Sequence, residues 1–111
     1  MPTEAEFRAA WSQGDAHAEP HAAGAWSAAT SEGRTREVGK SPPTRAGLHD
    51  LAGNVAEWLH VEPPAVAVAP VAGGSYLDAA EALRGLPLVS LEKRERARHV
   101  GFRVVVEPAV P

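Results

Sequence analysis

Apolar residues recur with a helical period near the start of the chain. Phe7, Ala10 and Trp11 are spaced i, i+3 and i+4, so one face of a helix would carry all three side chains. Gly14 then interrupts the pattern, as glycines commonly do where helices end. The pattern predicts a helix over about residues 4–12 that ends at Gly14.

A capping box is expected at the start of this helix. Thr3 is followed three residues later by Glu6. With this spacing the Thr3 hydroxyl can accept a hydrogen bond from the amide of Glu6, while the Glu6 carboxylate accepts one from the amide of Thr3. Both residues therefore favour a helix that begins directly after Thr3.

Two segments in the middle of the chain have the composition of strands. Residues 55–61 alternate tolerably between apolar and polar, and the Pro63-Pro64 pair would end a strand there. Residues 65–72 are small and apolar, but Pro70 has no amide proton and argues against a central position in a sheet.

The last apolar stretch predicts a strand over residues 99–106. Its alternation places Phe102, Val104 and Val106 on one face and Arg103 on the other. We expect the apolar face of this strand to contribute to the core.

The remaining segments predict irregular structure. Residues 13–46 are rich in Gly, Ser, Thr, Pro and Ala with little periodicity, which indicates a long loop. Gly73-Gly74 predicts a sharp bend, and residues 78–83 could form one helical turn. One helix, a few short strands and long loops together predict an α+β domain. We expect its core to contain Phe7, Trp11, Leu48, Leu51, Trp58, Tyr76, Phe102 and Val104.

The composition fits one small globular domain. The chain has 111 residues, of which 44% are hydrophobic and 23% charged. We assign residues 1–107 to one reduced domain and residues 108–111 to a tail. The formal charge is −3, and the one basic cluster, Lys93 to Arg98, contains Glu95 and directly follows Glu92. These charges argue against a nucleic acid as partner.

No targeting signal is visible in the sequence. No window reaches the roughly 18 apolar residues that a membrane span requires, and no basic region followed by an apolar run stands at the N-terminus. The chain has no cysteine, which is compatible with any compartment. We therefore expect no membrane span, and the cytoplasm is slightly favoured as the location.

The segment 47–58 carries the strongest candidate chemistry. Asp50 and Glu57 are seven residues apart, and Gly53 and Asn54 between them favour a tight backbone turn. Such a loop can direct two carboxylates and several backbone carbonyls at one point. Oxygen ligands of this kind suit Ca²⁺.

A second interpretation of this loop involves no metal. Asp50 would cap a turn, Asn54 would take a left-handed conformation, and Glu57 would pair with a buried arginine such as Arg103. The sequence alone leaves both interpretations open.

Four motifs occur along the chain in an order known from one protein family. They are PTEAEF at 2–7, GLHDLAGNVAEW at 47–58, GGSY at 73–76 and GFRVV at 101–105. Together they resemble the formylglycine-generating enzyme/sulfatase-modifying-factor family, whose fold is a variant of the C-type lectin fold. The resemblance covers about the C-terminal half of a typical family domain. It implies a compact C-type-lectin-like α+β domain of reduced size.

The resemblance also implies where a catalytic site would lie. Active formylglycine-generating enzymes bind copper(I) through two cysteines after the Gly-Gly-Ser motif, and these positions fall at about Asp78 and Leu83. Cu(I) prefers soft thiolate ligands, and the chain has no cysteine. We therefore expect no copper and no enzymatic activity from this chain alone.

Iron is not expected either. The family's iron-dependent branch binds the metal through histidines of an N-terminal helical region that this sequence does not contain. His17 and His21 are four residues apart, but Pro20 and loop-like surroundings argue against a shared helical face.

For Ca²⁺ the resemblance implies a specific ligand set. The ligands would be the carboxylates of Asp50 and Glu57 and the backbone carbonyls of Gly53 and Val55. A second calcium site in the family uses an Ala-Asn pair. Here Trp26 follows Ala25, so we expect that second site to be lost.

The expected function is that of a non-catalytic binding or scaffold domain, with Ca²⁺ as its one candidate cofactor. Its partner would be a protein or a larger assembly, contacted through the loops at residues 13–46 and 77–98. The alternative is a structural or accessory subunit. Such a subunit would complete a larger complex or a split oxidase-type enzyme whose partner chain supplies the other half.

Overall fold

The computed structural model describes residues 1–13, 24–44, 46–64 and 66–107. The predicted tail, 108–111, and the histidine pair His17 and His21 lie outside the described residues. The elements in chain order are helix α1 (Glu4–Gln13), strands β1 (Ala56–Trp58) and β2 (Val68–Ala72), 3-10 helix η1 (Ala80–Leu83), and strands β3 (Leu88–Glu92) and β4 (Val100–Gly101).

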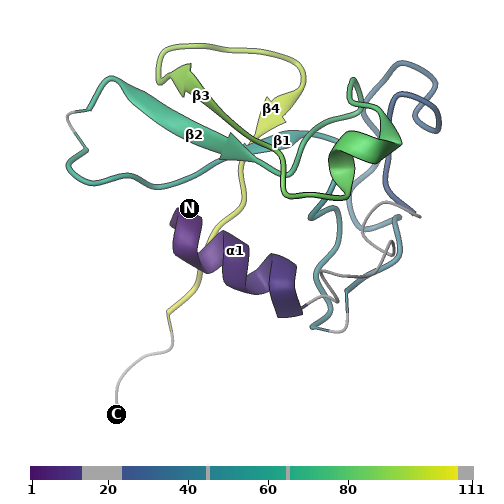
Figure 1. Ribbon diagram of the computed structural model, residues 1–111, viewed down its shortest axis with the longest axis horizontal. Helices are drawn as coiled ribbons and strands as arrows, with labels where there is room; N and C mark the ends of the chain where they lie inside the picture. Colours follow the sequence, from purple (N-terminus) through teal and green to yellow (C-terminus); the bar gives the residue numbers. More distant parts are fainter. Residues whose placement is uncertain (14–23, 45, 65, 108–111) are drawn as a thin grey trace.

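The four strands form one mixed sheet in the order β3-β2-β1-β4. Strand β1 runs parallel to β4 and antiparallel to β2, and β2 runs antiparallel to β3. Helix α1 lies against one face of the sheet, below it in Figure 1. The predicted α+β class is thus confirmed. No helix in the described part of the chain is long and apolar enough to cross a membrane.

Helix α1 begins and ends as its sequence pattern predicts. The Thr3 amide donates to Glu6 Oε1 at 2.9 Å, and the Glu6 amide donates to Thr3 Oγ1 at 3.2 Å. This is the expected capping box. The rings of Phe7 and Trp11 stack one helical turn apart, with centroids 6.3 Å from each other. Phe7 and Trp11 are buried in the core and Ala10 packs against it, so the predicted apolar stripe faces the interior.

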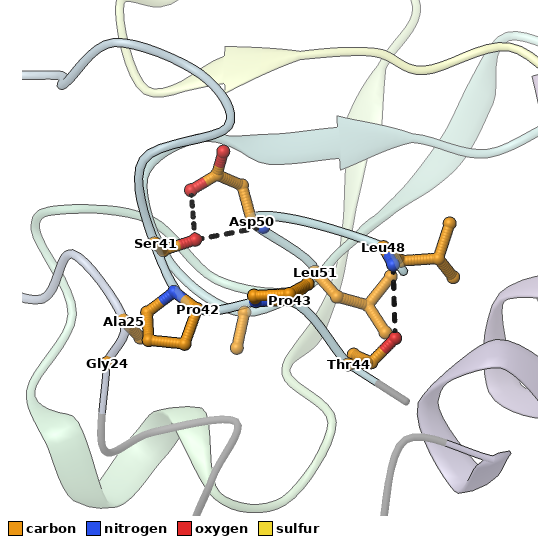
Figure 2. Close-up of a pocket in the computed structure, with 10 residues that line it drawn as sticks. Gly24, Ala25, Ser41, Pro42, Pro43, Thr44, Leu48, Asp50 and Leu51 are labelled. Atoms are coloured by element: carbon orange, nitrogen blue, oxygen red, sulfur yellow. Dashed lines mark hydrogen bonds between the residues drawn. The ribbon is translucent and has the colours of Figure 1, made fainter. Parts of the chain in front are cut away.

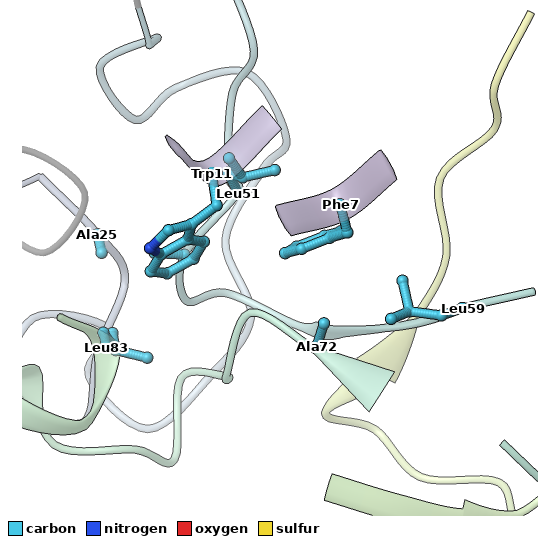
Figure 3. Close-up of a cluster of buried hydrophobic side chains, with 8 residues drawn as sticks. Phe7, Trp11, Ala25, Leu51, Leu59, Ala72 and Leu83 are labelled. Carbon is cyan, nitrogen blue, oxygen red and sulfur yellow. The ribbon is translucent and has the colours of Figure 1, made fainter. Parts of the chain in front are cut away.

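The core lies between α1, the sheet, the loops that precede β1 and the 3-10 helix η1 (Figure 3). Three of the eight predicted core residues, Phe7, Trp11 and Leu51, are buried in it. Three others are only half-buried, namely Leu48, Trp58 and Tyr76. The members of the core cluster are Phe7, Trp11, Ala25, Leu51, Ala52, Leu59, Ala72 and Leu83.

Strand β2 lies between β3 and β1, so the prediction that Pro70 would exclude this segment from a central position was wrong. The Pro70 carbonyl accepts a hydrogen bond from the Leu59 amide at 3.0 Å. In an antiparallel pair, the backbone nitrogen and oxygen of one residue point to the same neighbouring strand. The Pro70 nitrogen, which carries no proton, therefore also faces Leu59. Strand β1 ends at Trp58, one residue earlier. The proline is tolerated because the ladder is already ending at this point.

Strand β4 contains only Val100 and Gly101, so the predicted strand over 99–106 was too long. Phe102 and Val104 are each 67% exposed, and their assignment to the core was wrong. The side chain of Arg103 instead turns inward to the carboxylate of Glu57. Consecutive side chains of an extended segment point in opposite directions, so Phe102 and Val104 point to solvent.

Candidate functional site

After Gly47, whose φ is 85°, the 47–58 segment turns tightly at three further residues with positive φ. The φ angles are 56° at Asp50, 77° at Gly53 and 64° at Asn54. A Cβ atom on Gly53 would lie 2.7 Å from the carbonyl oxygen of Trp26, so the two backbones are in direct contact. The same carbonyl accepts a hydrogen bond from the Asn54 amide at 2.9 Å. The predicted turn and the left-handed Asn54 are both confirmed.

The Asp50 carboxylate caps a neighbouring turn. Its Oδ1 accepts from the Ser41 hydroxyl at 2.8 Å, and its Oδ2 accepts from the Gly39 amide at 2.9 Å. The Asp50 amide donates back to the Ser41 hydroxyl oxygen at 3.2 Å. Figure 2 shows the two contacts with Ser41 beside a small cavity of about 30 Å³. Both oxygens of Asp50 are therefore used within the chain.

The Glu57 carboxylate is buried and paired with Arg103. The residue is 3% exposed, and both of its oxygens accept hydrogen bonds from the guanidinium, Oε1 from Nε and Oε2 from Nη2 at 2.9 Å. Burial raises the pKa of the Glu57 carboxyl, and the hydrogen bonds and charge of Arg103 oppose that rise. Nη2 also donates to the carbonyls of His49 at 3.0 Å and Asp50 at 3.1 Å.

This donor set does not fit Ca²⁺ in the form that the family resemblance implies. Glu57 faces a fixed positive charge, and Asp50 is directed at Ser41 and Gly39. Among the described residues no group of three or more acidic or histidine side chains could hold a metal ion. Ca²⁺ binding by Asp50, Gly53, Val55 and Glu57 stays a prediction. The interpretation without a metal matches the contacts seen here.

A second candidate site lies on the face of the sheet away from α1, beside the turn that follows Gly73-Gly74. It is a pocket of about 290 Å³, and its lining includes Ser75, Asp78 and His99. Two apolar side chains at this pocket, Leu77 and Val89, are 58% and 57% exposed. His99 was not predicted as a site residue, because only the fold brings it to the same pocket as Asp78.

Asp78 shapes the turn at this pocket. Its Oδ2 accepts from the Ser75 amide at 2.7 Å and from the Ser75 hydroxyl at 3.4 Å. Leu83, the other position that would match a catalytic cysteine, is fully buried in the core at the end of η1. Hence the two positions differ here: Asp78 lines the pocket, and Leu83 packs away from solvent. The predicted helical turn over 78–83 is confirmed as η1, Ala80–Leu83.

A cation–π contact occupies Trp26, the residue that follows Ala25. The Arg36 guanidinium carbon lies 5.2 Å from the centroid of the Trp26 ring, a cation–π geometry. Arg36 Nε donates to the Ser31 carbonyl at 2.9 Å. The contact of Arg36 with Trp26 was not predictable from the sequence, since nothing in the loop composition pairs the two residues.

Comparison with known proteins places this geometry in a family. Residues 1–108 match the sulfatase-modifying factor enzyme 1-like domain. The solved structure of Treponema denticola variable protein 1 is 28% identical, with a TM-score of 0.72 over 92% of this chain and 45% of that one. This chain thus spans less than half the length of that protein.

A second solved structure, that of CarF, is also 28% identical but has a TM-score of 0.47, with 61% of this chain and 26% of that chain covered. No protein with a curated description matches the sequence. The match over 1–108 and the likeness to the Treponema structure confirm the resemblance drawn from the four motifs and the C-type-lectin-like fold that it implied. The chain belongs to the sulfatase-modifying factor enzyme 1-like family.

Proposed function

We propose that this chain is a non-catalytic binding domain whose pocket beside Asp78 holds an apolar ligand group that carries an N–H donor. The observation that carries the proposal is the exposure of Leu77 and Val89 at a pocket with a carboxylate in its wall. Apolar walls with a few placed polar groups are typical of ligand sites. The family membership itself leaves open whether a member is catalytic.

The polar groups of the pocket support recognition of a ligand that donates a hydrogen bond. Of the two carboxylate oxygens of Asp78, only Oδ2 accepts hydrogen bonds from described residues. Oδ1 is therefore left for a ligand. A carboxylate accepts from an amine or ammonium more strongly than from a neutral donor. His99 lines the same pocket and offers a second polar contact.

The serine in the pocket supports binding rather than covalent chemistry. Ser75 is 1% exposed, its hydroxyl donates to Asp78, and its Oγ accepts from the Leu77 amide at 3.2 Å. A nucleophilic serine needs a base that takes its proton and an accessible oxygen. The chain also has no cysteine to bind copper(I).

The experiment is an NMR titration of the full chain with phenethylamine, which joins an aromatic ring to an ammonium. We expect shifts at Leu77, Asp78 and Val89, and at least roughly tenfold weaker binding in both Asp78→Asn and Val89→Ser. Val38→Ser is the matched control, because Val38 is 75% exposed and lies outside this pocket. Equal binding in all four proteins, or shifts confined to other residues, would refute the proposal.

A second candidate function is that of a subunit completed by another chain. Apolar side chains follow β4 in close succession, and Phe102, Val104 and Val106 are 67%, 67% and 83% exposed. Exposed apolar clusters of this kind mark protein interfaces. Sedimentation velocity distinguishes the two candidate functions. Self-association of the chain that Phe102→Ser abolishes favours the subunit function. A monomer at high concentration counts against a subunit that assembles with copies of itself.

A further inference from the structure

The guanidinium of Arg103 lies among four oxygens of the loop region. They are the two carboxylate oxygens of Glu57 and the backbone carbonyl oxygens of His49 and Asp50. The carboxylate belongs to β1, the carbonyls belong to the loop before it, and Arg103 follows β4. One positive group thus ties three separate segments together.

The kinds of oxygen around Arg103 are those that a hard cation would use. Carboxylate and backbone carbonyl oxygens are the usual protein ligands of Ca²⁺. A buried carboxylate requires a compensating charge, and removal of its partner leaves that charge unpaired. Glu57, at 3% exposure, has this requirement and meets it with Arg103.

We infer that Arg103 is a built-in cation that takes the place of a metal ion in this loop. Its guanidinium binds Glu57 and the two carbonyls at once and keeps a divalent cation away from them. The loop of this chain is then independent of Ca²⁺ while Arg103 is present. If the side chain is removed, the same oxygens become available to a metal ion. This inference concerns a different site from the pocket beside Asp78 and does not depend on it.

The test is thermal unfolding of the full chain in EDTA and in millimolar CaCl₂. For the natural sequence we expect the same Tm in both. For Arg103→Ala we expect a Tm lower by roughly 10 °C or more in EDTA, because Glu57 is left buried and unpaired. CaCl₂ should restore part of that loss, and the double variant Arg103→Ala with Glu57→Gln should gain nothing from CaCl₂.

A conservative variant keeps the inference testable if Arg103→Ala does not fold. Arg103→Lys retains one charge but cannot form the forked contact with both Glu57 oxygens. We expect it to fold with an intermediate Tm and to stay insensitive to CaCl₂.

Three outcomes would overturn the inference. One is a Ca²⁺-dependent rise in the Tm of the natural sequence that Glu57→Gln removes. Another is an unchanged Tm in Arg103→Ala. The third is a loss in Arg103→Ala that CaCl₂ does not reduce at all, because the arginine would then provide an ion pair without replacing a metal.

Discussion

The side chain of Asn54 forms two hydrogen bonds with the backbone of Arg36, eighteen residues earlier. Its Oδ1 accepts from the Arg36 amide at 2.9 Å, and its Nδ2 donates to the Arg36 carbonyl at 3.1 Å. The carboxamide thus satisfies both polar groups of one loop residue, as a neighbouring strand would. Asn54 is 2% exposed, so water cannot replace these bonds. A single side chain therefore joins the irregular N-terminal loop to the turn before β1.

Asn54→Asp should be destabilising although the shape of the side chain is kept. The new carboxylate can still accept from the Arg36 amide but cannot donate to its carbonyl. A buried acceptor left unpaired costs about 1–3 kcal/mol in the free energy of unfolding. Urea unfolding measures the loss, and hydrogen exchange should show the Arg36 amide still protected. Equal stability of both proteins would contradict the role assigned to Nδ2.

Gly53→Ala should cost far more than Gly33→Ala. Both glycines have positive φ, 77° and 74°, so both alanines have similar backbone strain of about 1–2 kcal/mol. Only at Gly53 would the added Cβ meet another atom, the Trp26 carbonyl oxygen at 2.7 Å, whereas nothing lies within 4 Å at Gly33. We expect an additional loss of about 1–3 kcal/mol at Gly53 by urea unfolding. Similar losses at both positions would show that the backbones separate easily.

Leu83→Ala and Leu77→Ala form a matched pair of core and surface substitutions. Leu83 is fully buried in the cluster with Trp11, and Leu77 is 58% exposed. We expect a loss of about 2–5 kcal/mol for Leu83→Ala and a change within about 0.5 kcal/mol for Leu77→Ala. Chemical denaturation measures both. A large loss at Leu77 would mean that this side chain packs against the protein in solution.

The capping box should contribute to stability in a pH-dependent way. Hydrogen bonds to the backbone and side chain of Thr3 lower the pKa of Glu6 from its ordinary value of 4.5. A lowered pKa in the folded state means that the contribution is complete above pH 4.5 and is lost as the pH falls through the folded value. The stability difference between the natural sequence and Glu6→Gln should therefore shrink under acid. Urea unfolding from pH 7 to pH 3 checks this, and a constant difference would refute it.

Local features of the sequence were sufficient to predict α1 and the turn before β1. The bonds between Thr3 and Glu6, and the conformations of Gly53 and Asn54, involve residues close in the chain. The conformational preferences of these residues do not depend on how the rest of the chain folds.

The segment after β4 was not predictable in this way. The alternation of apolar and polar residues predicts an extended segment here, but it does not show which face of that segment packs against the rest of the protein. That choice depends on Glu57, 46 residues earlier, which requires a counter-charge in the interior. The pocket beside Asp78 was missed for a similar reason, because His99 and Val89 reach it only through the pairing of β2 with β3 and the return of the chain to β4.

The contact between Arg103 and the loop also has a consequence for the order of folding. The Asp50 carbonyl and its donor on Arg103 are 53 residues apart, so this contact closes a long stretch of chain. A nascent chain that ends before residue 103 contains every residue of the 47–58 turn but lacks the group that neutralises Glu57. On the ribosome, the turn should therefore reach its final form only after Arg103 has emerged from the exit tunnel.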